Sequence, residues 1–553
     1  MKADKPDPRS ISWRARAVRD LESGTASLGI ELGSTNIKST LVAADGTPLA
    51  SGSSGWENTL VDGHWSYALD SVWEGVQESY RNVASAVEKE YGVPLTSVAS
   101  FGVSAMMHGY LAFDEQGSLL VPFRTWRDTT TGEAAARLTQ LFGVNIPLRW
   151  SIAHYYQAII DGEDHIPRVS FLTTLAGYVH WRLTGNKVLG IGDAVGMFPI
   201  DAKTKDYDQT MVAAFDDLTS ESPVPCGIAS LLPRVLVAGE KAGELTEEGA
   251  RLLDPSGRLA PGALACPPEG DAGTGMVATN SVRPRTGNVS VGTSIFAMLV
   301  LDKPQKMMNP AIDPVATPSG DPVAMVHCNN GAQEVSTWIE LFAEVAVAFG
   351  KFKINSMDEV YAAILAEALH GDKDCGGVVA YNYLSGEPIA GVGEGRPVIT
   401  RASNASMSLA NFIRAELFSC FATLAMGMDA LREEGVGCDT LYAHGGLFRT
   451  EGVAQRLLAA ALGTPVGLAP SAATGGSWGM AILAMYAVRG DGIPLPDFLA
   501  DTVFGETKDR IVEPVEADIE GFRAFLTRFK QGLPWAGEAA EAVLNINDTN
   551  ETE

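Results

Sequence analysis

Residues 27–42 read SLGIELGSTNIKSTLV, and the interpretation of the whole chain starts from this stretch. Two runs that alternate apolar with small or polar residues, 28–32 and 37–42, flank Gly33-Ser34-Thr35-Asn36. Alternation with a period of two is typical of a half-buried strand, so the stretch predicts a β-hairpin. A glycine and two hydroxyl residues at the tip suit a phosphate, because backbone N–H and hydroxyl groups can donate to its oxygens. Taken alone, an ordinary turn explains the same residues.

A second copy of the pattern lies in the other half of the chain. Residues 287–300 read GNVSVGTSIFAMLV, in which Gly292-Thr293-Ser294 aligns with Gly33-Ser34-Thr35. Both second strands end in Leu-Val, and the two copies are much further apart than the period of a solenoid repeat. The repeat therefore predicts a duplicated domain, in which each half offers one phosphate-binding hairpin to a shared cleft.

Length and composition set the broad class of protein. A chain of 553 residues should form two or more domains, and its 46% hydrophobic and 20% charged residues are typical of a soluble globular protein. The formal net charge of −26 argues against nucleic acid as a partner, because nucleic-acid-binding surfaces are basic. It does not exclude an anionic nucleotide, since local N–H donors or a metal ion can reverse the field.

Cysteine usage and hydropathy bear on location. The six cysteines are scattered without a CxxC pair, which indicates reduced thiols rather than a disulfide framework or a zinc site. No apolar run approaches the roughly 18 residues of a membrane helix, and the first residues lack the apolar core of a secretory signal. We therefore expect a cytoplasmic protein with no membrane partner. The sequence does not determine the oligomeric state and is compatible with a homodimer.

The chain divides into four segments. They are a polar N-terminal extension at 1–26, an N-terminal domain at 27–262, a C-terminal domain at 263–495, and a C-terminal segment with an acidic tail at 496–553. Each central segment contains one of the two hairpins. The N-terminal extension is polar and carries four arginines, so we expect a solvated arm.

Two motifs in the first half suit a polyhydroxylated ligand. Met107-His108-Gly109 follows a buried-type strand at 98–103, and loops after the carboxyl ends of strands bind ligands in open α/β sheets. His108 could donate to a hydroxyl, although a core histidine is an equal alternative. Trp126-Arg127-Asp128 combines an apolar face, a donor fork and an acceptor, which together suit a polyol. The alternative is that Asp128 caps a helix at 128–141.

Three further positions suit a reaction at a phosphate. Asp271 is a carboxylate among small residues at a strand-to-helix junction, where a hydroxyl could reach it, so it is a candidate general base or else an N-cap. Glu31 lies near the first hairpin tip and could hold a cation through water. Gly445-Gly446 follows a strand and leaves room for a flat base or a ribose, or is a plain glycine turn.

In chain order these motifs resemble those of the FGGY carbohydrate kinases, within the superfamily of actin-like proteins, sugar kinases and chaperone ATPases. The matching stretches are GIELGSTNIK at 29–38, MHG at 107–109, WRD at 126–128, WRLTG at 181–185, GD at 270–271, GTS at 292–294 and HGG at 444–446. They cover roughly residues 27–490, and the ordered set is much more specific than any one motif. The resemblance implies an α/β fold of two duplicated actin-like (ribonuclease H-like) domains around a central cleft. It also implies ATP and Mg²⁺ as cofactors and a sugar or polyol as substrate.

The resemblance also implies roles residue by residue. Asp271 would be the base that accepts the proton of the sugar hydroxyl. The residues implied at the ATP site are Gly33, Ser34, Thr35 and Lys38 for the terminal phosphate, Gly292 and Thr293 for the inner phosphates, and Gly445 and Gly446 for the adenosine. Those implied at the sugar site are Met107, His108, Trp126, Arg127, Asp128 and Asp271. The first two resemble the pair that meets the ketopentose in xylulokinases.

Two positions depart from the family pattern. Glu31 stands where the family commonly has Asp, so its distance to magnesium can differ even if it holds the ion through water. Leu447-Phe448 follows the glycine pair where smaller residues are common, so the adenine pocket can differ as well.

The function expected from the resemblance is in-line phosphoryl transfer from MgATP to a terminal hydroxyl of a ketopentose. Met107-His108-Gly109 favours D-xylulose, whereas the long first half and the Trp-Arg-Asp motif favour L-ribulose. D-ribulose and glycerol are alternative substrates. A non-catalytic sugar and ATP sensor or a chaperone-like ATPase is the alternative of another class, and Asp271 with both hairpins argues against the sensor.

Overall fold

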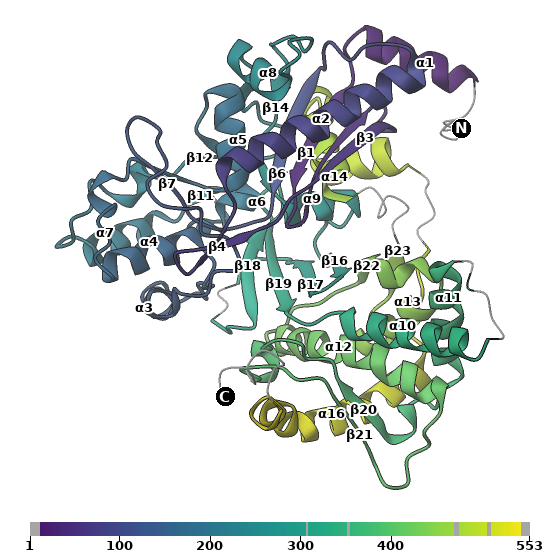
Figure 1. Cartoon of the computed structure of the whole chain (residues 1–553). Helices are drawn as coiled ribbons and strands as arrows, with labels where there is room; N and C mark the ends of the chain where they lie inside the picture. Colours follow the sequence, from purple (N-terminus) through teal and green to yellow (C-terminus); the bar gives the residue numbers. More distant parts are fainter. Residues whose placement is uncertain are drawn as a thin grey trace.

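The computed structural model describes residues 11–305, 308–350, 354, 356–468, 475–505 and 510–543. The described residues form two α/β halves, each built on its own mixed β-sheet (Figure 1). The prediction of a duplicated α/β protein is therefore confirmed.

The first sheet contains the hairpin expected at 27–42. Its strands run in the order β13-β14-β6-β1-β2-β3, and β15 also pairs with β6. Their bounds are β1 (Ser27–Leu32), β2 (Asn36–Val42), β3 (Pro48–Gly55), β6 (Ser100–Ala105), β13 (Gly243–Glu244), β14 (Leu264–Ala265) and β15 (Glu269–Gly270). β1 is antiparallel to β2 and parallel to β6, so the tip at 33–35 lies beside the carboxyl end of β6.

The second sheet repeats this plan. Its order is β18-β19-β17-β16-β22-β23, with β16 antiparallel to β17 and parallel to β22. The bounds are β16 (Thr286–Val291), β17 (Ile295–Val300), β18 (Ile312–Ala316), β19 (Pro322–Cys328), β22 (Thr440–Gly445) and β23 (Val466–Leu468). Five strands in each sheet share order and direction, and β18 is an added edge strand in the second.

Helices cover both sheets. The helices are α1 (Ile11–Glu22), α2 (Leu69–Tyr91), α3 (Gly132–Phe142), α4 (Ser151–Ile160), α5 (Leu175–Thr184), α6 (Ile191–Ala194), α7 (Gln209–Leu218), α8 (Glu247–Leu253), α9 (Asp271–Ala278), α10 (Gln333–Ala348), α11 (Met357–Glu367), α12 (Leu409–Glu433), α13 (Val453–Leu462), α14 (Gly475–Arg489), α15 (Leu495–Phe498) and α16 (Glu516–Ala542). The other strands form two-stranded pairs: β4 (Thr59–Val61) with β5 (His64–Ser66), β7 (Leu111–Phe113) with β8 (Phe171–Thr173), β9 (Val188–Gly190) with β12 (Arg234–Leu236), β10 (Ile200–Asp201) with β11 (Asp206–Tyr207), and β20 (Val378–Tyr381) with β21 (Val398–Arg401).

The chain returns to the first sheet near its end. Helix α14 packs against β1, β6 and α9 although it follows the second sheet in sequence. The approach is close enough to require a glycine, because a Cβ at Gly29 would lie 2.1 Å from the carbonyl oxygen of Ser477. The domain boundaries predicted at 262/263 and 495/496 remain a prediction, and α14 is the part of the second segment that lies on the first half.

The expectation of a solvated N-terminal arm is wrong for its second part. Residues 11–22 form α1, and Trp13, Ala17 and Leu21 are buried on one side of it. Apolar residues at intervals of four place these three side chains on one helical face, which packs toward Tyr91 of α2. Residues 1–10 and the acidic tail at 547–553 lie outside the described residues.

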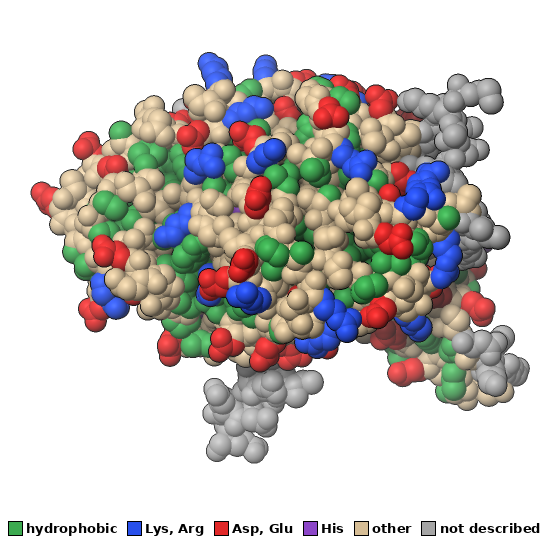
Figure 2. Space-filling model, turned by 90° about the horizontal axis from the view of Figure 1, so that it is seen from above, with side chains coloured by type: hydrophobic (Ala, Val, Ile, Leu, Met, Phe, Trp, Pro, Cys, Tyr) green, Lys and Arg blue, Asp and Glu red, His purple; other side chains and the backbone are tan. Residues whose placement is uncertain are grey.

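The visible surface is rich in charged side chains, and the longest apolar helix is buried, as expected for a chain that folds around internal cores. Acidic and basic side chains are interspersed on the face shown in Figure 2 rather than gathered by sign.

Helix α12 is long and apolar enough to cross a membrane, but 83% of its most apolar window is buried inside the structure. It is therefore the core helix of the second half.

Candidate active site

Three candidate segments meet at one edge of the first sheet. Strand β15 pairs in parallel with β6, which places Gly270 opposite Ala105, and β6 in turn places Ala105 opposite Leu32. The residues that follow these strands are Asp271, Met106-Met107 and Gly33. The backbone N–H of Met107 donates to Oδ1 of Asp271 at 3.2 Å, so the carboxylate lies directly against the predicted sugar loop.

The environment of Asp271 suits proton transfer near neutral pH. Burial, and then the nearby Glu31 carboxylate, raise the pKa of Asp271 to about 7. A group whose pKa lies near the working pH can both accept a proton and release it, which is what a general base needs. Gly270, not Asp271, occupies the N-cap position of α9, so the capping alternative is wrong.

Glu31 contacts the N-terminus of α14, which sequence patterns did not suggest. Its Oε2 accepts a hydrogen bond from the backbone N–H of Ser477 at 3.1 Å, and a Cβ at Gly476 would lie 2.3 Å from its Oε1. Burial raises the pKa of Glu31, and Lys38, its partner across the β1–β2 hairpin, opposes that shift.

The Glu31 carboxylate fits a magnesium ion that is bound mainly by phosphates. Among the residues that the structure describes, no group of three or more His, Cys, Asp or Glu side chains could hold a metal ion. Mg²⁺ in phosphoryl-transfer sites uses one or two carboxylates together with substrate phosphates and waters. Glu31 supplies one carboxylate beside the first hairpin tip, which agrees with this requirement.

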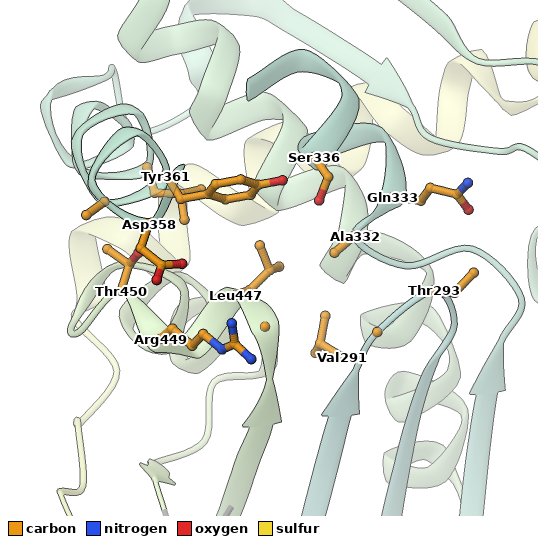
Figure 3. Close-up of a pocket in the computed structure, with 14 residues that line it drawn as sticks. Val291, Thr293, Ala332, Gln333, Ser336, Asp358, Tyr361, Leu447, Arg449 and Thr450 are labelled. Atoms are coloured by element: carbon orange, nitrogen blue, oxygen red, sulfur yellow. The ribbon is translucent and has the colours of Figure 1, made fainter. Parts of the chain in front are cut away.

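The second hairpin opens into a cavity of about 640 Å³. Its walls come from the β16–β17 tip, from α10 and α11, and from the segment after β22 (Figure 3). Gly292, Thr293 and Gly446 all line it, so the structure brings these three predicted residues together. Gly445 lies opposite Val291 in the sheet at φ 122°, and a Cβ there would lie 2.0 Å from the Val291 carbonyl oxygen. Only glycine fits this position.

Several side chains of this cavity were missed from the sequence. Figure 3 shows the Tyr361 ring of α11 directed toward Ser336 of α10, with Leu447 and the Arg449 guanidinium below the ring, on the segment after β22. Leu447 is one of the two larger residues noted after the glycine pair, and it does line the cavity. No local pattern indicates that Ser336 of α10 and Tyr361 of α11 line one cavity, because the two helices meet only in the folded structure.

A second cavity, of about 880 Å³, lies between the two halves. Its wall from the first half includes Trp126, Arg127, Asp128 and Arg149. Its wall from the second half includes Asp313, His327, Asn329 and Ser385. The predicted Trp-Arg-Asp motif therefore faces residues of the other half. Met107, His108 and Asp271 are not among the residues that line this cavity.

The Asp128 side chain is already occupied by protein donors. Its Oδ1 accepts from the backbone N–H and the hydroxyl of Thr130 at 2.9 and 2.7 Å, and its Oδ2 contacts Nδ1 of His64. Burial opposes ionisation, but the donors of Thr130 and His64 outweigh it and lower the pKa of Asp128. The predicted helix at 128–141 begins instead at Gly132, so Asp128 does not cap it.

Arg127 remains accessible to a ligand. Its guanidinium lies over the Trp65 ring, 4.2 Å from the ring centre, and donates to Oδ1 of Asn58 at 3.3 Å. Trp65 and His64 belong to the β4–β5 hairpin, which no sequence motif marked as part of the site.

His108 is held in a constrained position within the predicted sugar loop. It is buried, its φ is 70°, and a Cβ at Gly196 would lie 2.4 Å from its Nδ1. Burial, and then the charge of Arg149, keep the pKa of His108 well below its usual value. Its ring is therefore neutral at physiological pH.

The chain matches two family models. The model described as the N-terminal domain of the FGGY family of carbohydrate kinases matches residues 26–255, and the model of the C-terminal domain matches residues 287–488.

Curated relatives and solved structures agree with these matches at low identity. A protein named xylulose kinase from Staphylococcus xylosus is 21% identical over 235 residues, which are 40% of this chain and 44% of the relative. One from Klebsiella pneumoniae is 22% identical over 379 residues, 65% of this chain and 69% of the relative. The chain thus spans less than half of the first relative's length.

Three solved structures resemble the chain over nearly its whole length. That of xylulose kinase from Rhodospirillum rubrum has a TM-score of 0.73 at 18% identity and covers 92% of this chain and 99% of its own. The structure of gluconate kinase from Lactobacillus acidophilus has a TM-score of 0.74 at 16% identity, and the match covers 93% of this chain and 100% of the other. The structure of Plasmodium falciparum glycerol kinase with ADP has a TM-score of 0.68 at 14% identity, and the match covers 93% of this chain and 98% of the other. At these identities the structures show a shared fold.

Proposed function

The chain belongs to the FGGY family of carbohydrate kinases, and we propose that it transfers the γ-phosphoryl group of ATP to a terminal hydroxyl of a ketopentose. The observation that carries the proposal is the position of Asp271. Its carboxylate binds the N–H of Met107 at 3.2 Å beside the first hairpin tip. The proposed base, the proposed sugar loop and the proposed phosphate-binding turn thus lie at one sheet edge.

The ATP site would combine both hairpins. Gly33, Ser34, Thr35 and Lys38 would contact the terminal phosphate. Gly292 and Thr293 would contact the inner phosphates, and Gly445 and Gly446 would leave room for the adenosine. The cavity of about 640 Å³ supports this assignment, because it joins the second hairpin tip to Gly446. Magnesium, when bound, neutralises phosphate charge, and Glu31 would hold it through water.

The protein groups contribute position and one proton transfer. Phosphoryl transfer needs alignment and charge neutralisation more than covalent help. Asp271 would accept the proton of the attacking hydroxyl, for which general-base catalysis contributes on the order of 10² to 10⁴ in rate. Closure of the two halves around the bound sugar would exclude water that otherwise hydrolyses ATP.

D-xylulose and L-ribulose are the proposed acceptors. The relatives named xylulose kinase favour D-xylulose, and Trp126 and Arg127 on the wall of the cavity of about 880 Å³ support a polyhydroxylated substrate. Structures named gluconate kinase and glycerol kinase share the fold, so these acceptors, with D-ribulose, are the alternatives.

A substrate panel tests the proposal. We would measure ADP release with D-xylulose, L-ribulose, D-ribulose, gluconate and glycerol, and compare kcat/KM. We expect a ketopentose to give the highest value, with little ATP hydrolysis in its absence. A higher value for gluconate or glycerol would overturn the ketopentose assignment. Full ATP turnover without any sugar would instead indicate a chaperone-like ATPase, and none with any sugar would indicate a sensor.

A further inference from the structure

Arg149 anchors the sugar loop through its backbone. The residue lies just before α4, and its carbonyl oxygen accepts a hydrogen bond from the N–H of Gly109 at 3.2 Å. Two residues later, the hydroxyl of Ser151 donates to the Gly109 carbonyl at 2.5 Å. Gly109 adjoins His108, so the segment 149–151 determines where the His108 backbone lies.

The side chain of Arg149 reaches the other half of the molecule. Its guanidinium forms an ion pair with the carboxylate of Asp313, on the edge strand β18. Asn145 donates to the same carboxylate at 3.2 Å and to the carbonyl oxygen of Ile312 at 3.0 Å. The Arg149 and Asp313 side chains are 19% and 8% exposed, so water screens this pair much less than a surface pair.

Strand β18 connects this ion pair to the second phosphate hairpin. Asp313 lies opposite Met325 of β19, Met325 opposite Met298 of β17, and Met298 opposite Asn288 of β16. Neighbouring strands are about 4.8 Å apart, so three steps of a hydrogen-bonded ladder span roughly 14 Å. A displacement of β18 would therefore be transmitted to the β16–β17 hairpin.

We propose that Arg149 is a positioning residue for phosphoryl transfer. Through its hydrogen bond to Gly109 and its ion pair with Asp313, Arg149 connects the sugar loop at 107–109 to the half that carries the second phosphate hairpin. We call this connection the tie. This role rests on the proposed kinase function. Arg149 and Asp313 both line the cavity between the halves, so their ion pair lies on the cavity that also contains Trp126 and Arg127 of the proposed sugar site. The expected effect of this connection is to fix the position of the bound sugar relative to the ATP phosphates.

The electrostatic environment agrees with this position between the two walls. Burial, and then Arg149, lower the pKa of His108 on the first half and, on the second half, lower the pKa of His327 to about 3. The Arg149 guanidinium therefore lowers the pKa of one histidine in each half.

Hydrogen exchange tests the tie without any substrate. The variants are Arg149→Met, Asp313→Asn and the double variant, with Arg283→Met as control because it removes an exposed ion pair to Asp497 at 2.8 Å. We expect faster exchange in peptides covering 106–110 and 312–316, by about fivefold or more, in both single variants. The double variant should add little, and the control should leave these peptides unchanged. Unaltered exchange in Arg149→Met would overturn the proposal.

Kinetics separate positioning from direct sugar binding. With the sugar selected by the panel, we expect kcat to fall about 10- to 100-fold in each single variant and no further in the double variant, since a misplacement near 1 Å costs about 10²-fold. ATP affinity should change less than twofold. If Arg149→Met raises only the sugar KM and Asp313→Asn changes neither constant, Arg149 is a sugar ligand and the proposal is wrong. If wild type phosphorylates no sugar, the proposed function fails, while hydrogen exchange still decides whether the tie exists.

Discussion

Replacement of Asp271 by Asn is the sharpest test of the proposed chemistry. The two side chains have the same shape, and the Asn oxygen can still accept from the backbone N–H groups of Met107 and Ala272, which now donate to Asp271 at 3.2 and 2.9 Å. The fold and the sugar loop should therefore persist. The amide cannot take up a proton, so only the base is removed.

The expected loss of activity follows from the role of a general base. Its removal should lower kcat by about 10²- to 10⁴-fold, or roughly 3 to 5 kcal/mol of transition-state stabilisation. In wild type, kcat/KM should rise with pH around the pKa of Asp271, about 7, because only the carboxylate accepts a proton. Asp271→Asn should lack this rise, and ATP affinity should stay within a few-fold.

Although Asp271→Asn should lower activity, it should raise the stability of the folded protein at alkaline pH. The pKa of Asp271 is about 7 in the folded protein, above its usual value of 3.8, so the folded state prefers the protonated form. This contribution to stability is present below pH 4 and is lost as pH rises through 7. The shift corresponds to at most roughly 4 kcal/mol, less where water reaches the half-buried side chain. Asp271→Asn should therefore melt higher than wild type at pH 8 and differ little at pH 4.

The assay couples ADP release to NADH oxidation from pH 5.5 to 9, with thermal melts at pH 4 and 8 on the same samples. Turnover within tenfold of wild type, or an unchanged rise of kcat/KM with pH, would refute Asp271 as the base. A variant that melts well below wild type at pH 8 would refute the account of its burial.

Three other substitutions test separate parts of the structure. Glu31→Gln removes the charge that helps raise the pKa of Asp271, so the rise of kcat/KM should move to lower pH; an unmoved profile would contradict this coupling. Gly445→Ala places a Cβ about 2.0 Å from the Val291 carbonyl at φ 122°, so ATP affinity by titration calorimetry should fall at least tenfold, and wild-type affinity would refute the close approach. Trp13→Ala should cost about 3 to 5 kcal/mol in denaturant unfolding, because Trp13 is 3% exposed, whereas a loss below 1 kcal/mol would mean that α1 is not part of the core.

Local patterns in the sequence were sufficient to predict a duplicated domain and to single out Asp271 at a strand-to-helix junction. Alternating runs around 33–36 and 292–294 predicted both hairpins, because strand periodicity and turn residues act over a few neighbouring positions. The repetition of the pattern predicted the duplication, and the second sheet does repeat the order of the first. Asp271 stood out because a carboxylate after a strand-like segment is visible without knowledge of the packing.

Other features were decided only by the tertiary structure. Asp128 looked available to a ligand, yet His64 and Thr130 occupy its oxygens. Arg149 and Asp313 are distant in sequence, and nothing local indicates that they pair across the two halves. Such contacts depend on how the sheets and helices pack, because an ion pair or a cavity wall needs the distance between two segments, whereas periodicity reports only the structure within one.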